Sequence, residues 1–242
     1  MQRLTVGAES QLLQELMDAL TRKKGRIQEG VFSWTGSITA RSPWRRMGST
    51  PYEVVIGEIL LGKTTYAVAA RVYRRFIHHF PTISSLAEAS ENELARVIGY
   101  YCPKRHIAYV KAVIEGLVKE GIEKVPKDSY ALRALGLEHH SIRCIMCFGY
   151  GVHLSVMDSN VSRMLSRVFH NDLPVKPSAG LIQAMGETLL PEFNPAQYNA
   201  SLLDLAEQIC RIARPLCVQC SVRDVCDYVN ANIDTPSIHA KG

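Results

Sequence analysis

Hydrophobic residues recur at helical spacing along most of this chain. In the stretch 65–80, apolar side chains step by three and four positions, while arginines and histidines fill the opposite face. Similar patterns predict helices over 104–120, from Val161 onward, over 177–190 and over 195–210. Most of the chain is therefore expected to form amphipathic helices.

The signals at the ends of these segments agree with that interpretation. Ser90, followed three positions later by Glu93, has the form of a capping box that opens a further short helix. The chain has no sustained alternation of period two and no Asn-Gly or Asp-Gly hairpin signal. The sequence therefore predicts an all-α fold.

Composition places the chain among ordinary globular proteins. It has 242 residues, of which 47% are hydrophobic and 21% charged, which excludes disorder and collagen-like repeats. No apolar run approaches the roughly 18 residues that cross a bilayer, and the N-terminus lacks a secretory signal. We expect a cytoplasmic protein with no membrane partner. The net charge of +5 permits a polyanionic partner without requiring one.

Four of the seven cysteines gather near the C-terminus with six, two and five residues between them: Cys210, Cys217, Cys220 and Cys226. A loop of this kind can wrap four thiolates around an inorganic centre. Zinc sites usually pair two short Cys-x2-Cys turns, whereas a cubane iron–sulfur cluster suits longer gaps. The spacing favours a cluster, and zinc or four buried thiols remain the alternatives. The other three are expected to be small buried hydrophobes: Cys102, Cys144 and Cys147.

The six-two-five spacing at the end of a helical chain resembles the iron–sulfur loop of the endonuclease III and MutY (HhH-GPD) family of DNA glycosylases. Other segments match in the family's order, namely 42–46 with 50–52, 57–65, 99–101 with 104–105, and 156–163. The match extends over about residues 40–228. The run from Glu58 to Thr65 is most similar to the thymine-mismatch glycosylases of the Mig type, and so is 145–148, whereas Gly-Tyr-Tyr at 99–101 is more similar to MutY.

This resemblance implies two helical lobes with a DNA-binding cleft between them. A six-helix barrel with a helix-hairpin-helix is expected over 51–150, and an iron–sulfur cluster lobe over 1–50 plus 151–228, followed by a polar tail at 229–242. The resemblance also implies a [4Fe-4S] cluster on the four clustered cysteines. The implied partner is double-stranded DNA that contains a mismatch or a modified base, bound by a monomer.

Two carboxylates are candidates for breaking the glycosidic bond, a reaction that places positive charge on the sugar and negative charge on the departing base. Asp158 precedes a helix, so from the residues alone it is either an N-cap or a catalytic group. Glu58 lies in an apolar run, either at a solvent-facing edge or in a pocket. The resemblance implies that Asp158 stabilises the sugar cation and positions water. It implies that Glu58 contacts or protonates the extruded base, with burial raising its pKa.

His140 matches the position that holds lysine in the bifunctional members of the family. Without an amine there, a Schiff base with the sugar is not expected, so the protein should release the base and leave the strand intact. His140 is expected to hydrogen-bond the flipped base, the alternative being a solvent-facing helix histidine.

Five residues are expected to contact DNA. The base must leave the duplex, and side chains that wedge into the gap are expected at Lys63, Tyr100 and Tyr101, where core packing is the alternative for the tyrosines. Gly136 keeps the first glycine of the family's Leu-Pro-Gly-x-Gly hairpin, which binds phosphate through backbone N–H groups, while a glutamate replaces the second. Asn160 completes the set, within the segment that carries Asp158.

The sequence therefore predicts a monofunctional DNA glycosylase of base excision repair that acts on a mispaired or modified pyrimidine, thymine or uracil opposite guanine first. The alternatives are excision of adenine opposite oxidised guanine, a modified-cytosine glycosylase, and a catalytically silent DNA-binding iron–sulfur protein.

Overall fold

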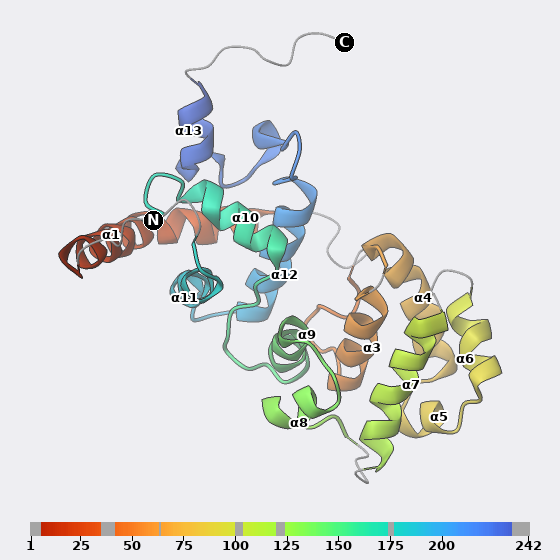
Figure 1. Cartoon of the computed structure of the whole chain (residues 1–242). Coiled ribbons are helices and arrows are strands. Elements are labelled where there is room, and N and C mark those ends of the chain that lie inside the picture. The colour runs from red at the N-terminus through yellow and green to blue at the C-terminus, as the bar shows by residue number, and fades with distance from the viewer. Residues whose placement is uncertain are drawn as a thin grey trace. The chain divides into compact units, whose positions relative to one another are not determined.

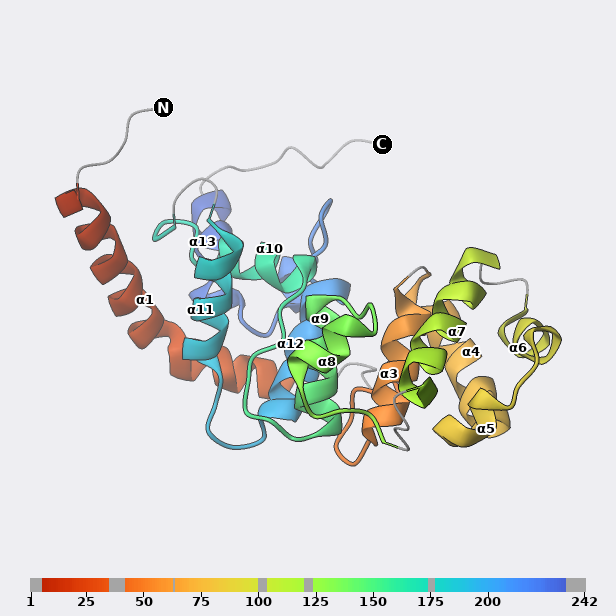
Figure 2. The same cartoon turned by 60° about the horizontal axis from the view of Figure 1, so that its bottom comes forward.

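The computed structural model describes residues 6–34, 42–62, 64–99, 104–119, 124–173 and 177–233 (Figures 1 and 2). Every regular element within these ranges is a helix, which confirms the all-α prediction. None of the described helices combines the length and the apolar composition needed to cross a membrane. The chain divides into two compact units, Ser37–Val156 and the pair Met1–Gly36 with Met157–Gly242.

The unit Ser37–Val156 is built around one apolar helix, α3 (Pro51–Leu61), in which eight residues are buried. A capping box formed by Thr50 and Glu53 fixes its start, and Pro51 occupies the first turn, where its missing N–H costs nothing. The other helices of this unit are α4 (Tyr66–His79), α5 (Ile83–Ala87), α6 (Glu91–Ile98), α7 (Lys104–Lys119), α8 (Ser129–Ala134), α9 (His139–Cys144) and the π-helical segment Ile145–Gly149. Helix α3 packs against α4, α7, α9 and the π-helical segment.

The helices predicted from periodicity and capping in this unit are present. Helix α4 buries one apolar face and exposes its arginines, as the pattern over 65–80 predicts. Helix α6 begins at the predicted capping box, where the backbone N–H of Ser90 donates to Glu93 at 2.8 Å and the backbone N–H of Glu93 donates to the Ser90 hydroxyl at 3.3 Å. Local signals were sufficient here because each bond joins residues three apart.

The unit of the two chain ends contains α1 (Val6–Ser33), α10 (Ser159–Val168), α11 (Ala179–Leu189), α12 (Pro195–Gln208) and α13 (Asp227–Ile233). Helix α1, which the sequence analysis did not identify, packs against α11 and α12. Lys23 of α1 joins it to the end of α10 and the start of α13. Its Nζ donates to the Val168 carbonyl at 2.9 Å and to Asp227 at 2.6 Å, and lies 3.6 Å from Asp172.

The division between the units differs from the expected one at residues 42–50 and 151–156, which were assigned to the cluster lobe but belong to the unit of α3. In the first of these segments, Trp44 and Arg45 are buried within that unit, at 0% and 2% exposure. The expected polar tail also begins too early, since α13 continues through Ile233 and buries Val229. The rest of the tail lies outside the described residues.

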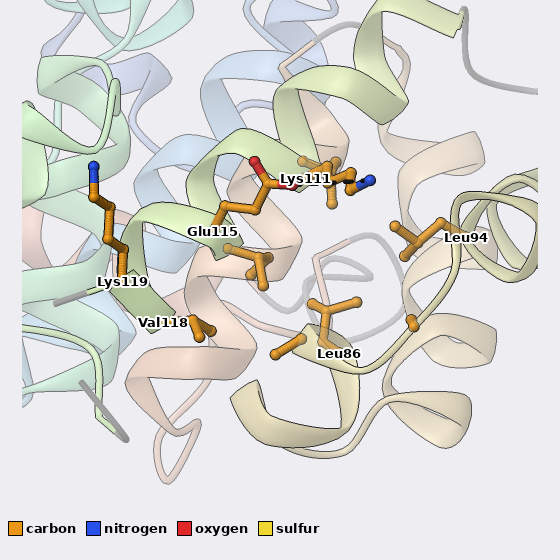
Figure 3. A pocket seen from close by; sticks show the side chains of 10 residues that line it. Leu86, Leu94, Lys111, Glu115, Val118 and Lys119 are labelled. Atoms are coloured by element: carbon orange, nitrogen blue, oxygen red, sulfur yellow. Dashed lines mark ion pairs between the residues drawn. The ribbon is translucent and has the colours of Figure 1, made fainter. Parts of the chain in front are cut away.

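A largely apolar cavity of about 220 Å³ lies among α5, α6 and α7 (Figure 3). Leu86, Leu94 and Val118 line it, and Lys111 pairs at its rim with Glu115 at 3.8 Å. None of the predicted site residues lines this cavity.

The close packing of Trp44 on α3 generates a stability prediction. A methyl group added at Gly57 would lie 2.0 Å from the Trp44 ring, so Gly57→Ala should destabilise the protein by about 1–3 kcal/mol through overpacking. Gly62→Ala, at the end of the same helix, meets nothing closer than 3.6 Å and should be neutral or stabilising by up to about 1 kcal/mol. Urea unfolding of both variants checks this; equal midpoints would contradict it.

Candidate active site and metal centre

Glu58 lies in the middle of α3 and is 3% exposed. Arg45 binds it in a bidentate manner, with Nε 2.7 Å from Oε1 and Nη2 3.0 Å from Oε2. The indole Nε1 of Trp44 donates to Oε1 at 2.8 Å. The planar guanidinium matches both carboxylate oxygens at once, which makes this a geometrically specific buried ion pair.

The charge state of Glu58 differs from the expectation. Burial raises the pKa of this carboxyl, but the charge and hydrogen bonds of Arg45, together with His140 and Trp44, outweigh burial and lower the pKa below its ordinary value of 4.5. The predicted rise in pKa is therefore wrong, because the sequence did not reveal that Arg45 would be buried on the same oxygens. Glu58 is a carboxylate near neutral pH and accepts hydrogen bonds.

His140, on α9, contacts this ion pair. Its Nε2 lies 3.1 Å from Arg45 Nη2 and 3.8 Å from Glu58 Oε2, and the side chain is 28% exposed. Since a guanidinium can only donate, Nε2 is the acceptor of the bond to Arg45. Arg45 also donates to the Tyr66 hydroxyl at 3.0 Å. The side chain of His140 therefore joins the buried cluster instead of facing only solvent.

The same place brings together three metal-ligand types, Glu58, His140 and Cys144, whose ligand atoms lie within 4.8 Å of one another. One feature disfavours a metal there, because the Arg45 guanidinium already holds both oxygens of Glu58 and places its own positive charge at that carboxylate. We infer that these side chains form a hydrogen-bonded cluster around the Arg45 guanidinium and not a metal site.

Asp158 is the N-cap of α10, as one of the two interpretations from the sequence predicted. Its Oδ1 accepts the backbone N–H of Val161 at 2.8 Å, and its Oδ2 accepts Asn160 Nδ2 at 3.2 Å. The carboxylate is partly buried. Capping and catalysis are compatible here, because the cap bonds fix the direction of the carboxylate without neutralising its charge.

Asn160 is held in turn by Arg163, a residue that the sequence analysis did not select. Arg163 Nη2 donates to Asn160 Oδ1 at 3.1 Å, and Arg163 Nε donates to the Cys210 carbonyl at 2.8 Å. This chain of hydrogen bonds joins Asp158 to the start of the cysteine loop. The signal that could have identified Arg163 is its position one helical turn after Asn160.

The four predicted metal-ligating cysteines line one cavity, together with Arg167. Burial, as the largest cause, and the neighbouring cysteines together raise the pKa of the thiols of Cys217, Cys220 and Cys226, that of Cys220 to about 11. No disulfide joins any cysteine that the structure describes. Four converging thiolates would repel one another, so the site fits a positively charged centre that neutralises them.

The predicted hairpin lies between α8 and α9. Gly136 has φ of 82°, in the left-handed region that favours glycine, and its carbonyl accepts the Tyr109 hydroxyl at 3.2 Å. Glu138, in place of the family's second glycine, is exposed and caps α9 without a side-chain hydrogen bond. The predicted wedge residues Lys63, Tyr100 and Tyr101 lie outside the described residues.

Comparison with solved structures defines the class of fold. The chain is similar to the structure of a thermostable thymine-DNA glycosylase, with a TM-score of 0.77 and 22% identity over 88% of this chain and 99% of that one. A trapped endonuclease III–DNA covalent intermediate gives a TM-score of 0.67 at 17% identity, over 87% and 98% of the two chains. The fold is therefore the all-helical fold of these proteins.

The sequence comparison identifies the family. Residues 56–183 match the HhH-GPD superfamily of base excision DNA repair proteins, and the chain belongs to this family. This confirms the resemblance inferred from the sequence.

Relatives with two different substrates are among the matches. The chain is 24% identical to the thymine/uracil-DNA glycosylase of Methanothermobacter thermautotrophicus, over 88% of this chain and 97% of that protein. It is 25% identical to the adenine DNA glycosylase of Mycolicibacterium smegmatis, over 78% and 65%. The chain spans 65%, 54% and 38% of three adenine DNA glycosylases that it matches.

The buried ion pair generates a pH-dependent prediction. Arg45→Met leaves the Glu58 carboxylate buried without a counter-ion and should cost about 3–5 kcal/mol near neutral pH. In the native protein the lowered pKa of Glu58 contributes stability that is present above pH 4.5 and is lost as the pH falls through the folded-state pKa. In the variant only His140 and Trp44 still oppose burial, the largest cause, which then raises this pKa, so the loss of stability relative to the native protein should grow as the pH rises.

Urea unfolding between pH 4 and 8 measures this difference. Arg46→Met removes a neighbouring exposed arginine and should change stability by less than about 0.5 kcal/mol. The double variant Arg45→Met/Glu58→Gln should recover part of the loss, because no charge remains buried. A deficit that does not vary with pH would contradict the pairing.

Proposed function

We propose that this protein is a monofunctional DNA glycosylase of base excision repair that removes a mispaired or modified pyrimidine, thymine or uracil opposite guanine first. The observation that carries the proposal is that two hydrogen bonds orient the carboxylate of Asp158. Asp158 lies in the segment 156–163, which resembles the family's catalytic segment. Family membership and the thymine/uracil-DNA and adenine DNA glycosylases among the relatives support the reaction class.

Asp158 stabilises the positive charge that develops on the sugar and orients the attacking water. Its two oxygens are directed by the Val161 N–H and the Asn160 amide, so the carboxylate does not have to reorganise during the reaction. Arg163 keeps the Asn160 amide in the orientation that donates to Asp158. Asn160 and Arg163 therefore act as positioning residues.

The charge of the Glu58 cluster favours a pyrimidine over adenine. Adenine has basic ring nitrogens that an acid can protonate, whereas thymine and uracil present carbonyl oxygens that accept hydrogen bonds. Glu58 is held ionised by Arg45, so it lacks the proton that an acid would donate. His140 is partly exposed, and because its Nε2 accepts from Arg45, its ring N–H lies on Nδ1 and supplies a hydrogen-bond donor that suits a base departing as an anion.

The histidine at position 140 also determines whether the DNA strand is cleaved after the base is released. An imidazole forms no stable Schiff base with the sugar, so base release is not followed by cleavage through a covalent amine intermediate. Duplex DNA is bound by the Gly136 hairpin and, as the sequence predicts, by Lys63, Tyr100 and Tyr101. The exposed Glu138 weakens phosphate binding at the hairpin, because its carboxylate repels phosphate.

We further propose that the four clustered cysteines hold a [4Fe-4S] cluster. When bound, this group supplies positive charge that keeps all four sulfurs deprotonated and links the loop together. The chain's own part is to bring the four sulfurs to one cavity, which Met164, Arg167 and Val168 of α10 also line. Zinc would use the same donors, so the spacing, with only one short Cys-x2-Cys turn, is what favours the cluster.

Base release from defined duplexes tests the activity. Duplexes carrying thymine or uracil opposite guanine, adenine opposite oxidised guanine, or modified cytosine are incubated with the protein and then treated with alkali or left untreated. Cleavage only after alkali, fastest for thymine or uracil, is expected. Borohydride trapping of the protein on DNA would refute the monofunctional mechanism, and faster adenine release would refute the pyrimidine preference.

Asp158→Asn separates catalysis from capping. Asparagine is as good an N-cap as aspartate, so α10 should remain intact, whereas an amide cannot stabilise the sugar cation. We expect single-turnover base release to fall by about 10²–10⁴-fold with unchanged thermal stability. Asp18→Asn, on the exposed face of α1, is the matched loss of charge and should leave the rate unchanged. Native rates in Asp158→Asn would show a purely structural aspartate.

Metal analysis tests the cofactor. The purified protein should be brown and contain about four iron and four sulfide per chain. Cys217→Ala should lose iron, while Cys147→Ala, which removes a buried thiol outside the loop, should retain it. A colourless protein that contains zinc would overturn the assignment.

A further inference from the structure

Arg167, in the last turn of α10, donates directly to a sulfur of the cysteine loop. Its Nη1 lies 3.3 Å from Cys210 Sγ and 3.4 Å from the carbonyl oxygen of the same residue. Arg163 lies one turn earlier on the same helix and donates to the backbone oxygens of Cys210 and of Ala206 in α12, not to a cysteine sulfur. Arg167 thus differs from its neighbour in contacting a ligand atom.

The Arg167 guanidinium is fixed on several sides. Nη1 donates to the Arg211 carbonyl at 2.7 Å, and Nη2 donates to the Ile212 carbonyl at 3.0 Å. The guanidinium also lies over the Tyr228 ring, 4.9 Å from its centroid. These contacts hold the N–H group in place before any change of charge at the sulfur, so no reorganisation is needed.

A cationic donor at a ligand sulfur acts on the electron affinity of the bound cluster. Hydrogen bonds to the sulfurs stabilise the more negative, reduced state and so raise the reduction potential. The effect is strong where the donor is charged and partly shielded from water, as Arg167 is.

We propose that Arg167 sets the reduction potential of the iron–sulfur cluster through its hydrogen bond to Cys210 Sγ, an inference that rests on the cluster proposed above. Oxidation removes one electron from the cluster, and in the experiment an electrode accepts it. No proton is transferred, and no covalent bond forms or breaks. Without Arg167 the reduced state loses its charged donor. The equilibrium should then move about tenfold toward the oxidised state, which for a one-electron couple lowers the potential by about 59 mV.

The test measures iron and sulfide first and then the potential of the DNA-free holoprotein by film voltammetry. Arg167→Gln is compared with Arg211→Gln, which also removes one positive charge beside Cys210. Arg211 is exposed and donates to the Gln208 carbonyl at 2.8 Å instead of to a cysteine sulfur. We expect a lower potential in Arg167→Gln than in both the native protein and Arg211→Gln, at equal iron content.

Equal potentials in Arg167→Gln and Arg211→Gln would overturn the proposal, since the sulfur contact would then have no separate effect. If Arg167→Gln loses its iron, the test uses native protein labelled with ¹⁵N-arginine in place of that variant. Electron-nuclear double resonance of the paramagnetic cluster should then detect a ¹⁵N coupling that disappears in Arg167→Lys, and its absence would refute the contact. A native protein without iron would overturn the cluster assignment itself, whereas a cluster with an unshifted potential would overturn only the role of Arg167.

Discussion

The helical unit around α3 depends on the pairing of Glu58 with Arg45. A carboxylate in the centre of an apolar helix is tolerated only if another group compensates its lost hydration, and the bidentate guanidinium does this together with the Trp44 indole. The pairing requires the segment before α3 to fold back onto the helix, which buries Trp44 against Gly57. It also fixes the protonation state of Glu58, and therefore the kind of chemistry that this carboxyl can perform.

The unit of the two chain ends meets the same requirement, since its cysteine thiolates are also negative groups that need positive charge beside them. Converging thiols create a site that needs positive charge, and helix α10 directs two arginines at the loop that carries them. The same helix begins with Asp158, so one rigid element connects the candidate catalytic carboxylate with the cysteine loop. Lys23 of α1 holds the far end of this arrangement through Asp227, the residue directly after Cys226. The carboxylate of Asp158 and the cysteine loop are therefore supported by the same helices.

The sequence was most informative where the signal is local. Apolar periodicity located α4, α7, α10, α11 and α12, and the capping box at Ser90 located the start of α6, because these features depend on residues three or four positions apart. The spacing of the four cysteines likewise predicts a shared centre from the sequence alone. The sequence did not predict the packing of helix α1, because its partners α11 and α12 are distant in the sequence. It did not predict the packing of residues 42–50 on α3, because α3 is a uniformly apolar run with no polar face to show which side is covered.

The sequence by itself determined the helical class, the family, and the residue types available for chemistry. Only the tertiary structure decided what those residues can do. Glu58 was expected to gain a proton through burial, but Arg45, 13 positions earlier, reaches both of its oxygens and keeps it ionised. Arg163 and Arg167 gained their roles in the same way, through contacts with a loop more than 40 positions away. A side chain's charge state and orientation depend on the groups around it in space, and linear spacing does not encode those.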